Sequence, residues 1–301
     1  MRRLTLAALS LALLCAALLP ATGAAFAGRN GVLAYGWSTL DEPELGPFRY
    51  SDGIRLIKAG GGAARVLASC LRSPGLPDVG NCEPSAYRAP SWSPDGTRIV
   101  FQAGPRLGLL DGDGGALRLL PAVGSDPADP VFSPSGTRLA FSTVVGGVRE
   151  LWTSDVYGRG ARRLLPGAAG SPSWSPRGTI AFVRGGRLWR VRSDGSGLRR
   201  LTGRQALRPA FSPHGTKIAF VRGGVVRIVD ADGGLLRTIG SLRDVTQVRW
   251  SPDGRKLVVE RFEAGIAIAN SDGSGIRTIV EDAVGATYNY GTRGVDWQPL
   301  R

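Results

Sequence analysis

One short motif recurs five times along this chain: an aromatic residue followed by Ser-Pro-x-Gly. The five copies begin at Trp92, Phe132, Trp174, Phe211 and Trp250, and a shortened sixth copy begins at Trp297. Successive aromatic residues are 40, 42, 37, 39 and 47 positions apart. A repeat of about 40 residues with four strand-like segments is typical of a β-propeller, in which each repeat forms one blade.

Each repeat encodes the same local structure. Within Ser-Pro-x-Gly, proline presets φ at the second turn position and glycine suits the fourth, which favours a type I turn. A short β-rich run follows, as in residues 97–101 (TRIVF) and 216–220 (TKIAF). Two further strand-like runs are separated by an Asp/Gly turn such as residues 194–197 (DGSG). The pattern therefore predicts four antiparallel strands per repeat.

The two ends of the repeat array predict the number of blades. Residues 30–35 (NGVLAY) resemble the second strand of a repeat, but no signature precedes them, and the matching first strand lies at residues 295–299 (VDWQP). We therefore predict an all-β, six-bladed β-propeller of four-stranded antiparallel blades, closed by a C-terminal strand that completes the N-terminal blade. Such closure removes the exposed sheet edges that an open array would keep.

The repeats resemble the WD40-like propeller repeat of the TolB family, whose pattern is W-S-P-D-G, I-A-F, a D-x-D-G turn and L-T. Residues 92–96 (WSPDG), 218–220 (IAF), 111–114 (DGDG) and 201–202 (LT) match it. The likeness covers nearly all of residues 29–301 and implies a six-bladed fold and a protein-binding role in the bacterial envelope. We expect this chain to lack the α/β domain that precedes the propeller in the TolB family.

Residues 1–27 have the layout of a secretory signal. Arg2 and Arg3 precede an apolar run at residues 4–19, and residues 25–27 (AFA) offer a small-x-small cleavage site before Gly28. We expect export to the periplasm, cell envelope or extracellular space, cleavage near Ala27, and a mature propeller of residues 28–301 without a membrane span. A retained N-terminal anchor is the alternative.

Two cysteines, Cys70 and Cys82, lie outside the signal. An even number of cysteines in an exported chain favours a disulfide, which would stabilise the insertion between them by about 3 kcal/mol. Two free thiols are the alternative. No metal site is expected, because two cysteines and one histidine cannot supply the usual zinc ligands.

The net charge of +14 is carried almost entirely by arginine, since the chain has only three lysines. One arginine falls at the equivalent position of the fourth strand in every blade: Arg65, Arg118, Arg163, Arg200, Arg237 and Arg277. Charged residues on an edge strand protect it against pairing with another chain. The other interpretation is weak, nonspecific attraction of polyanions. A dedicated nucleic-acid site is not expected, because the charges are dispersed rather than gathered in a stripe.

No catalytic residue and no cofactor are predicted. The single histidine, His214, occupies the variable position of a Ser-Pro-x-Gly turn, where sister repeats carry Asp, Ser or Arg. The Asp/Gly run at residues 111–115 lacks the terminal glutamate of a calcium loop, so hairpin turn chemistry explains it.

Two places remain as candidate binding sites. Three long insertions fall on one face of the predicted ring, beside the N-terminal blade, and long loops on a rigid scaffold commonly bind partners. They bring together the candidates Trp37, Asp41, Glu42, Phe48, Tyr50, Tyr87, Tyr288 and Tyr290. The alternative is that these loops cover an apolar seam at the closure. The second place is the channel mouth, with Asp129, Arg208, Gln247, Arg249 and Asp296. A structural ion pair between Arg249 and Asp296 is the simpler explanation there.

These observations predict an exported, monomeric, non-catalytic propeller that binds another envelope protein or a peptide. The alternative is a hydrolase or lyase that acts on a carbohydrate or a lactone at the channel mouth.

Overall fold

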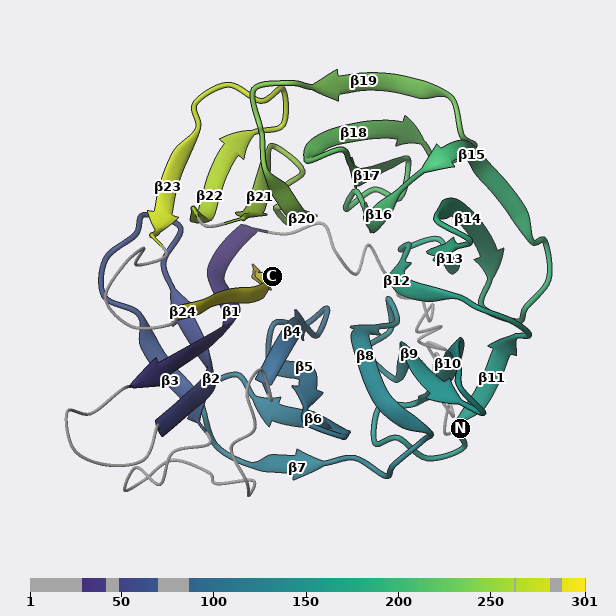
Figure 1. Ribbon diagram of the computed structural model, residues 1–301, viewed down its shortest axis with the longest axis horizontal. Coiled ribbons are helices and arrows are strands. Elements are labelled where there is room, and N and C mark those ends of the chain that lie inside the picture. Colours follow the sequence, from purple (N-terminus) through teal and green to yellow (C-terminus); the bar gives the residue numbers. More distant parts are fainter. Residues whose placement is uncertain (1–28, 42–48, 70–86, 263, 282–288, 301) are drawn as a thin grey trace, which may run out of the picture.

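The computed structural model describes residues 29–41, 49–69, 87–262, 264–281 and 289–300. These residues form six four-stranded sheets arranged as blades around a central channel (Figure 1). Every neighbouring pair of strands within a blade is antiparallel. The predicted all-β, six-bladed architecture is therefore confirmed.

Each blade has its first strand at the channel and its fourth strand at the circumference. Blades 1 and 2 contain β24 (Asn289–Leu300), β1 (Arg29–Asp41), β2 (Arg49–Ile57) and β3 (Arg65–Ser69), then β4 (Tyr87–Trp92), β5 (Arg98–Ala103), β6 (Arg106–Asp111) and β7 (Leu117–Leu119). Blades 3 and 4 contain β8 (Ser125–Phe132), β9 (Arg138–Val145), β10 (Val148–Asp155) and β11 (Arg162–Leu165), then β12 (Gly170–Trp174), β13 (Thr179–Arg184), β14 (Arg187–Arg192) and β15 (Arg199–Gln205). Blades 5 and 6 contain β16 (Leu207–Phe211), β17 (Lys217–Arg222), β18 (Val225–Asp230) and β19 (Leu235–Ile239), then β20 (Val245–Trp250), β21 (Lys256–Arg261), β22 (Gly265–Asn270) and β23 (Arg277–Val280).

Blade 1 closes the ring as predicted, because β24 pairs with β1 from Arg29↔Leu300 to Thr39↔Asn289. Side chains reinforce the junction. The Trp297 indole N–H donates to the Gly31 carbonyl at 3.2 Å, and the Gln298 amide donates to the Gly96 carbonyl of blade 2 at 2.8 Å. The closing strand β24 is therefore bonded both to β1 of its own blade and to blade 2.

The Ser-Pro-x-Gly turns form as the sequence indicates. In the first copy, the Gly96 N–H donates to the Ser93 carbonyl at 2.9 Å. The buried Ser93 hydroxyl accepts the Arg98 N–H at 2.9 Å and donates to the Asp95 carboxylate at 2.6 Å. One serine therefore satisfies a backbone donor that would otherwise be buried without an acceptor.

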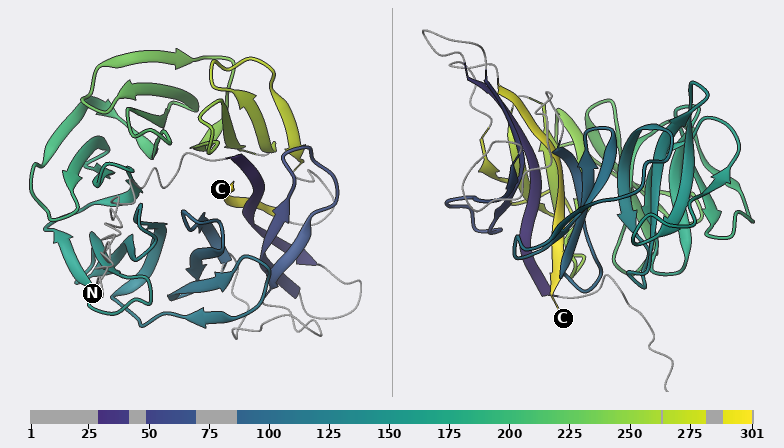
Figure 2. Two further views of the ribbon diagram at one scale, coloured as in Figure 1. Left: turned by 180° about the vertical axis from the view of Figure 1, so that it is seen from behind. Right: turned by 90° about the horizontal axis from the view of Figure 1, so that it is seen from below.

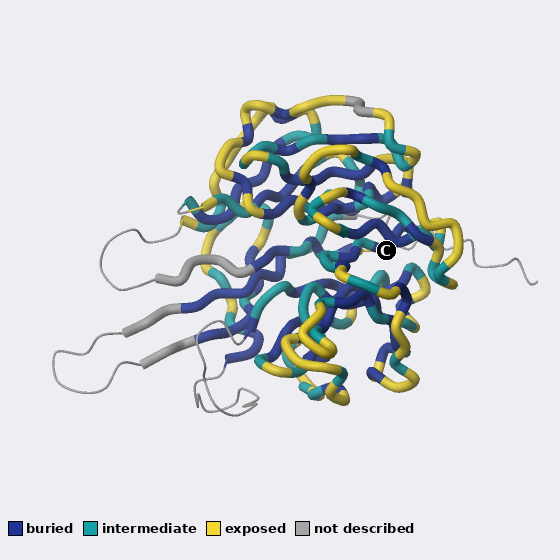
Figure 3. Tube along the Cα trace, turned by 45° about the vertical axis from the view of Figure 1, so that its right-hand side comes forward, coloured by how far each residue is buried: buried dark blue, intermediate teal, exposed yellow. Residues whose placement is uncertain are grey.

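The hydrophobic core is divided into six clusters, and each cluster lies between two neighbouring blades. Between blades 4 and 5, for example, Leu201 packs with Phe220 and Val229. The cluster between blades 6 and 1 joins Val258 to Trp297, so closure buries it. The inner strands are buried and the turns exposed (Figure 3). Stability therefore resides in the interfaces between blades rather than in one central core.

Strand direction defines two faces of the ring. One end of the ring carries the turns between the second and third strands and the connections between blades. We call this end the insertion face, and we call the opposite end the tight-turn face. The ends of β1 and β2, together with the start of β24, extend beyond the ring on the insertion face (Figure 2). The six arginines predicted for the fourth strands lie on the outermost strands β3, β7, β11, β15, β19 and β23, and all six are exposed. The predicted basic ring around the circumference is therefore present.

Candidate functional site

The channel is lined by the residue that precedes the aromatic position in each blade. Ser91, Val131, Ser173 and Ala210 are small or apolar, whereas two adjacent blades contribute Arg249 and Asp296. The lining encloses about 90 Å³, enough for several water molecules or a very small solute. The prolines of three Ser-Pro-x-Gly or related turns line the end at the tight-turn face: Pro213, Pro252 and Pro299.

Arg249 and Asp296 face the same channel, but they form no direct ion pair within the described residues. The Arg249 Nη1 donates to the Val248 carbonyl at 3.0 Å, and the Asp296 Oδ2 accepts the Trp92 N–H at 2.8 Å. Burial lowers the pKa of Arg249, and the carboxylates of Asp296 and Asp129 oppose that shift. Burial raises the pKa of the Asp296 carboxyl, although Arg249 pulls it the other way.

The channel mouth on the insertion face is built by one residue from each blade, three positions before the aromatic residue of the repeat motif. Four of these residues are not glycine and yet have left-handed φ, each directly before a proline: Ala89 (52°), Asp129 (51°), Ser171 (51°) and Arg208 (49°). Left-handed φ is uncommon for such residues, and a following proline disfavours helical backbone. The strain is therefore spread around the mouth, and Gly294 with φ 84° avoids it in blade 1.

Three of these positions are linked across blades 3, 4 and 5. The Asp129 carboxylate forms an ion pair with Arg208 and accepts the Ser171 hydroxyl at 3.0 Å. In blade 6, the buried Gln247 amide donates to the Val295 carbonyl at 3.2 Å. Of the five predicted channel-mouth residues, Asp129, Arg208 and Gln247 thus lie at the mouth, and Arg249 and Asp296 lie deeper in the channel.

Two of the predicted insertion-face residues are buried. Trp37 packs in the core between blades 6 and 1, with the Arg55 guanidinium 3.8 Å from its ring centre. Tyr87 packs edge-on against Phe101, with ring centres 5.2 Å apart. For these two side chains, the structure favours the cover of an apolar seam over an exposed contact surface. A Cβ on Gly53 would lie 2.6 Å from Trp37 Nε1, so the absence of a side chain at Gly53 leaves the space that the Trp37 indole fills.

The other predicted residues are less defined. Asp41, Tyr50 and Tyr290 lie on β1, β2 and β24, where the backbone alone is described. Glu42, Phe48 and Tyr288 lie outside the described residues, as do Cys70 and Cys82 of the predicted disulfide.

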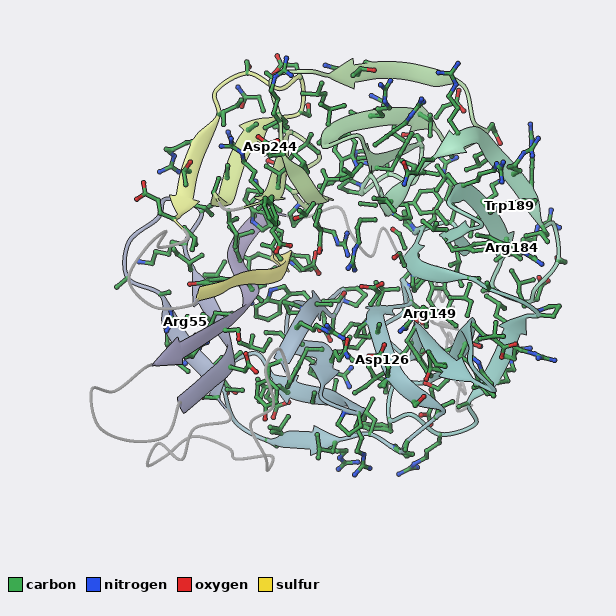
Figure 4. All side chains as sticks on the ribbon, in the orientation of Figure 1. Arg55, Asp126, Arg149, Arg184, Trp189 and Asp244 are labelled. Atoms are coloured by element: carbon green, nitrogen blue, oxygen red, sulfur yellow. The ribbon has the colours of Figure 1, made fainter. Side chains whose placement is uncertain are left out.

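Sequence reasoning missed an ionic cluster on the insertion face between blades 2 and 3. The Asp126 carboxylate forms ion pairs with Arg88, at 3.2 Å, and with Arg149 (Figure 4). The Gln102 amide also donates to it at 3.1 Å. Asp126 has φ 49°, a value that aspartate tolerates better than most residues. No repeat signal marks these residues, because they come from different strands of two blades.

Exposed apolar side chains on the insertion face were missed as well. Phe262, directly after β21, is 66% exposed. Val145, Val148 and Leu207 are exposed on the same face. Isolated exposed apolar residues are ordinary, but a phenylalanine so open is uncommon and suits a contact surface.

The described part of the chain contains no group of three or more metal-ligating side chains and no helix long and apolar enough to cross a membrane. His214 is exposed in its turn, as expected.

A ring of six four-stranded blades around a side-chain-lined channel defines a six-bladed β-propeller domain. Residues 86–266 match the TolB beta propeller domain, which is more than half of the chain, and the chain belongs to that family. The Tol-Pal system protein TolB of Anaeromyxobacter dehalogenans is 32% identical over 134 residues, covering 42% of this chain. The match spans 30% of the length of that relative.

Solved structures show the same fold. The crystal structure of TolB from Acinetobacter baumannii aligns with a TM-score of 0.68 and 22% identity, covering 89% of this chain and 67% of that one. A chain in the crystal structure of a nidogen/laminin complex aligns with a TM-score of 0.66 and 11% identity, covering 88% and 98% of the two chains. At these identities the likeness concerns the fold alone.

Proposed function

We propose that this chain is an exported, non-catalytic propeller that acts as a protein-binding module in the bacterial cell envelope. Its partner would be another envelope protein or a peptide segment, bound at the insertion face beside blade 1. Membership of the TolB propeller family supports the envelope role, and the signal-like residues 1–27 support export.

The extension of blade 1 is the observation that carries this proposal. β1 pairs with β2 as far as Asp41↔Arg49, and β24 pairs with β1 as far as Thr39↔Asn289. The pairing of β2 with β3 ends at Gly53↔Ser69. Within the described strands, the outer edge of residues 49–51 is therefore not covered by β3. Uncovered strand edges beyond a rigid ring suit the addition of an extended segment from a partner.

A crosslinking pull-down from envelope extract tests the proposal. One variant changes Tyr50, Tyr288 and Tyr290 to Ala, and leaves the buried Trp37 intact. The matched control changes Tyr157 and Leu198 to Ala, because both are exposed on the tight-turn face, at 40% and 41%. We expect one protein to be recovered by the wild type and the control and lost with the first variant. Recovery of the same proteins by all three would refute binding at blade 1.

Export and cleavage have a separate test. N-terminal sequencing of the protein recovered outside the cytoplasm should begin at Gly28. A chain that still begins at Met1 would support the retained anchor instead.

One observation favours the enzymatic alternative. A carboxyl with a raised pKa inside a channel, as at Asp296, is typical of general acids. Turnover of an oligosaccharide or a lactone at the channel mouth that is lost in Asp129→Asn, in Asp296→Asn deeper in the channel, or on adding a chelator would support a hydrolase or lyase. Binding and folding that are indifferent to the chelator would support the module.

A further inference from the structure

Blades 4 and 5 carry most of the excess positive charge of the chain. Residues 170–240 contain thirteen arginines and lysines, three aspartates and no glutamate, against a net charge of +14 for the whole chain. The three aspartates, Asp194, Asp230 and Asp232, belong to the Asp/Gly turns on the tight-turn face. At the insertion-face end, these two blades therefore contribute arginines and no carboxylate.

A groove lies between these blades, lined by β15 of blade 4 and by β17 and β18 of blade 5. We call it the arginine groove, because Arg204, Arg222 and Arg227 line it, one from each strand. Its volume is about 310 Å³. Its floor is the core between the blades, where Leu201, Phe220 and Val229 are at most 8% exposed. The floor thus offers little apolar surface, and the distinctive chemistry of the groove is the guanidinium groups.

These three arginines have no acidic partner among the described residues. The side chains of Arg204 and Arg222 make no hydrogen bond there, and Arg227 donates only from Nη1, to the Thr238 hydroxyl at 2.8 Å. The Arg227 Nε is buried without an acceptor. Burial, and then the neighbouring charges of Arg227 and Arg204, lower the pKa of Arg222, which still remains charged. The three positively charged guanidinium groups are therefore held near one another, and several of their N–H donors have no acceptor in the described part of the chain.

A few other arginines of this protein have carboxylate partners. Arg88 and Arg149 share Asp126, Arg208 pairs with Asp129, and Arg163 pairs with Glu150 at 3.0 Å. Most arginines among the described residues have no carboxylate partner, so an unpaired guanidinium is ordinary here when it stands alone. The arginine groove differs because three unpaired arginines from three strands line one concave site, and this juxtaposition points to a ligand.

We propose that the arginine groove binds the phosphate group of a small molecule or of a lipid headgroup. A guanidinium donates two parallel hydrogen bonds to an oxyanion, and three guanidinium groups need more acceptor oxygens than the two of a carboxylate. A phosphate group has three or four oxygens and a charge near −2, which matches three converging cations. The groove is larger than a phosphate ion, so the organic part of an ester can be accommodated beside it.

Inorganic phosphate is the first probe, titrated at constant ionic strength and followed by calorimetry and by the melting temperature. The test variant is Arg222→Gln and the matched control is Arg237→Gln, which removes the same charge from the exposed outer strand of blade 5. We expect phosphate to bind and stabilise the wild type and the control, and to bind Arg222→Gln more weakly by about tenfold or more. Without phosphate, Arg222→Gln should melt no lower than the wild type, because a repulsion is relieved.

The melting temperature without phosphate distinguishes the loss of a binding site from misfolding of the variant. Equal phosphate responses in Arg222→Gln and Arg237→Gln, or no response in the wild type, would overturn the proposal in favour of diffuse attraction of anions. A lower melting temperature of phosphate-free Arg222→Gln would also count against it, because the arginine would then be structural.

Two further probes distinguish the sources of the phosphate group. Glycerol phosphate represents a soluble ester, and vesicles of phosphatidylglycerol, compared with phosphatidylcholine, represent a lipid headgroup. Arg222-dependent pelleting with the phosphatidylglycerol vesicles would identify a lipid ligand. Arg222-dependent binding of glycerol phosphate without pelleting would identify a soluble one.

Discussion

At the scale of single residues, the serine of each Ser-Pro-x-Gly turn has a structural role, because its side chain is buried within the turn. The five serines, Ser93, Ser133, Ser175, Ser212 and Ser251, are all buried. In four of the five turns, the serine hydroxyl accepts the N–H of the residue five positions later. The turn and the following strand are therefore locked together by one side chain.

We predict that Ser93→Ala lowers the free energy of unfolding by about 1–3 kcal/mol, because the Arg98 N–H loses its acceptor. Ser135→Ala is the control, since Ser135 is exposed at the variable turn position. It should stay within about 0.5 kcal/mol of the wild type. Urea unfolding measures both, and equal midpoints for the two variants would contradict the assigned role.

Asp296 should make the stability of the protein depend on pH. The pKa of Asp296 is raised in the folded protein, so the unfolded state loses this proton at lower pH than the folded state does. Stability contributed by this group therefore falls as pH rises above the ordinary carboxyl range. Asp296→Asn should melt at a higher temperature than the wild type at neutral pH. The difference should vanish below the pKa of an unperturbed aspartate.

Asp194 provides the opposite sign as a control. Hydrogen bonds from Ser196 lower the pKa of its carboxyl, so its contribution to stability is present above the ordinary carboxyl pKa and is lost in acid. Asp194→Asn should therefore not stabilise the protein at neutral pH. A melting temperature of Asp296→Asn below that of the wild type at neutral pH would show that Arg249 needs the carboxylate.

At the scale of the elements, turns that look alike in sequence are not equivalent in the ring. Gly96 and Gly178 close equivalent turns with φ of 71° and 79°. A Cβ on Gly96 would lie 2.2 Å from the Pro299 carbonyl oxygen, whereas a Cβ on Gly178 would meet nothing within 4 Å. Of these two turns, only the first supports the closing strand β24.

We therefore predict that Gly96→Ala destabilises the protein more than Gly178→Ala does, by about 1–3 kcal/mol. Both substitutions impose the same left-handed backbone, so the difference measures the contact with β24. Chemical unfolding of the two variants decides the matter. Equal losses would mean that the turn of blade 2 can shift away from Pro299 at no cost.

The elements also differ in how far local sequence could predict them. Turns, strands, blade number and the outer arginines follow from local patterns repeated at a fixed spacing, and all four are confirmed. The burial of Trp37 and Tyr87 did not follow, because an aromatic residue beside an insertion has the same local signal whether it packs inward or outward. The arginine groove was missed for a related reason. Arg204, Arg222 and Arg227 come from three strands of two blades. Arg222 ends its strand as Arg184 and Arg261 end theirs, so its repeat position alone does not mark a groove.

At the scale of the whole molecule, the six interblade cores make the ring depend on its closure. Removal of β24 would uncover β1 and take Val295 and Trp297 out of the core between blades 6 and 1. We predict that a chain ending at residue 288 loses cooperative thermal unfolding, and that a peptide of residues 289–301 added in trans restores it. Circular dichroism measures both. A truncated chain that melts as the wild type does would show that five complete blades suffice.

The closing ladder also has a consequence for the order of events in the cell. The Trp297 indole and the Gly31 carbonyl that it contacts are 266 residues apart. Synthesis delivers β1 early and β24 late, so β1 waits without its inner neighbour while five other blades are made. The blade whose synthesis starts first is thus the last to be completed. A nascent chain of this design needs protection of β1 against premature pairing during that interval.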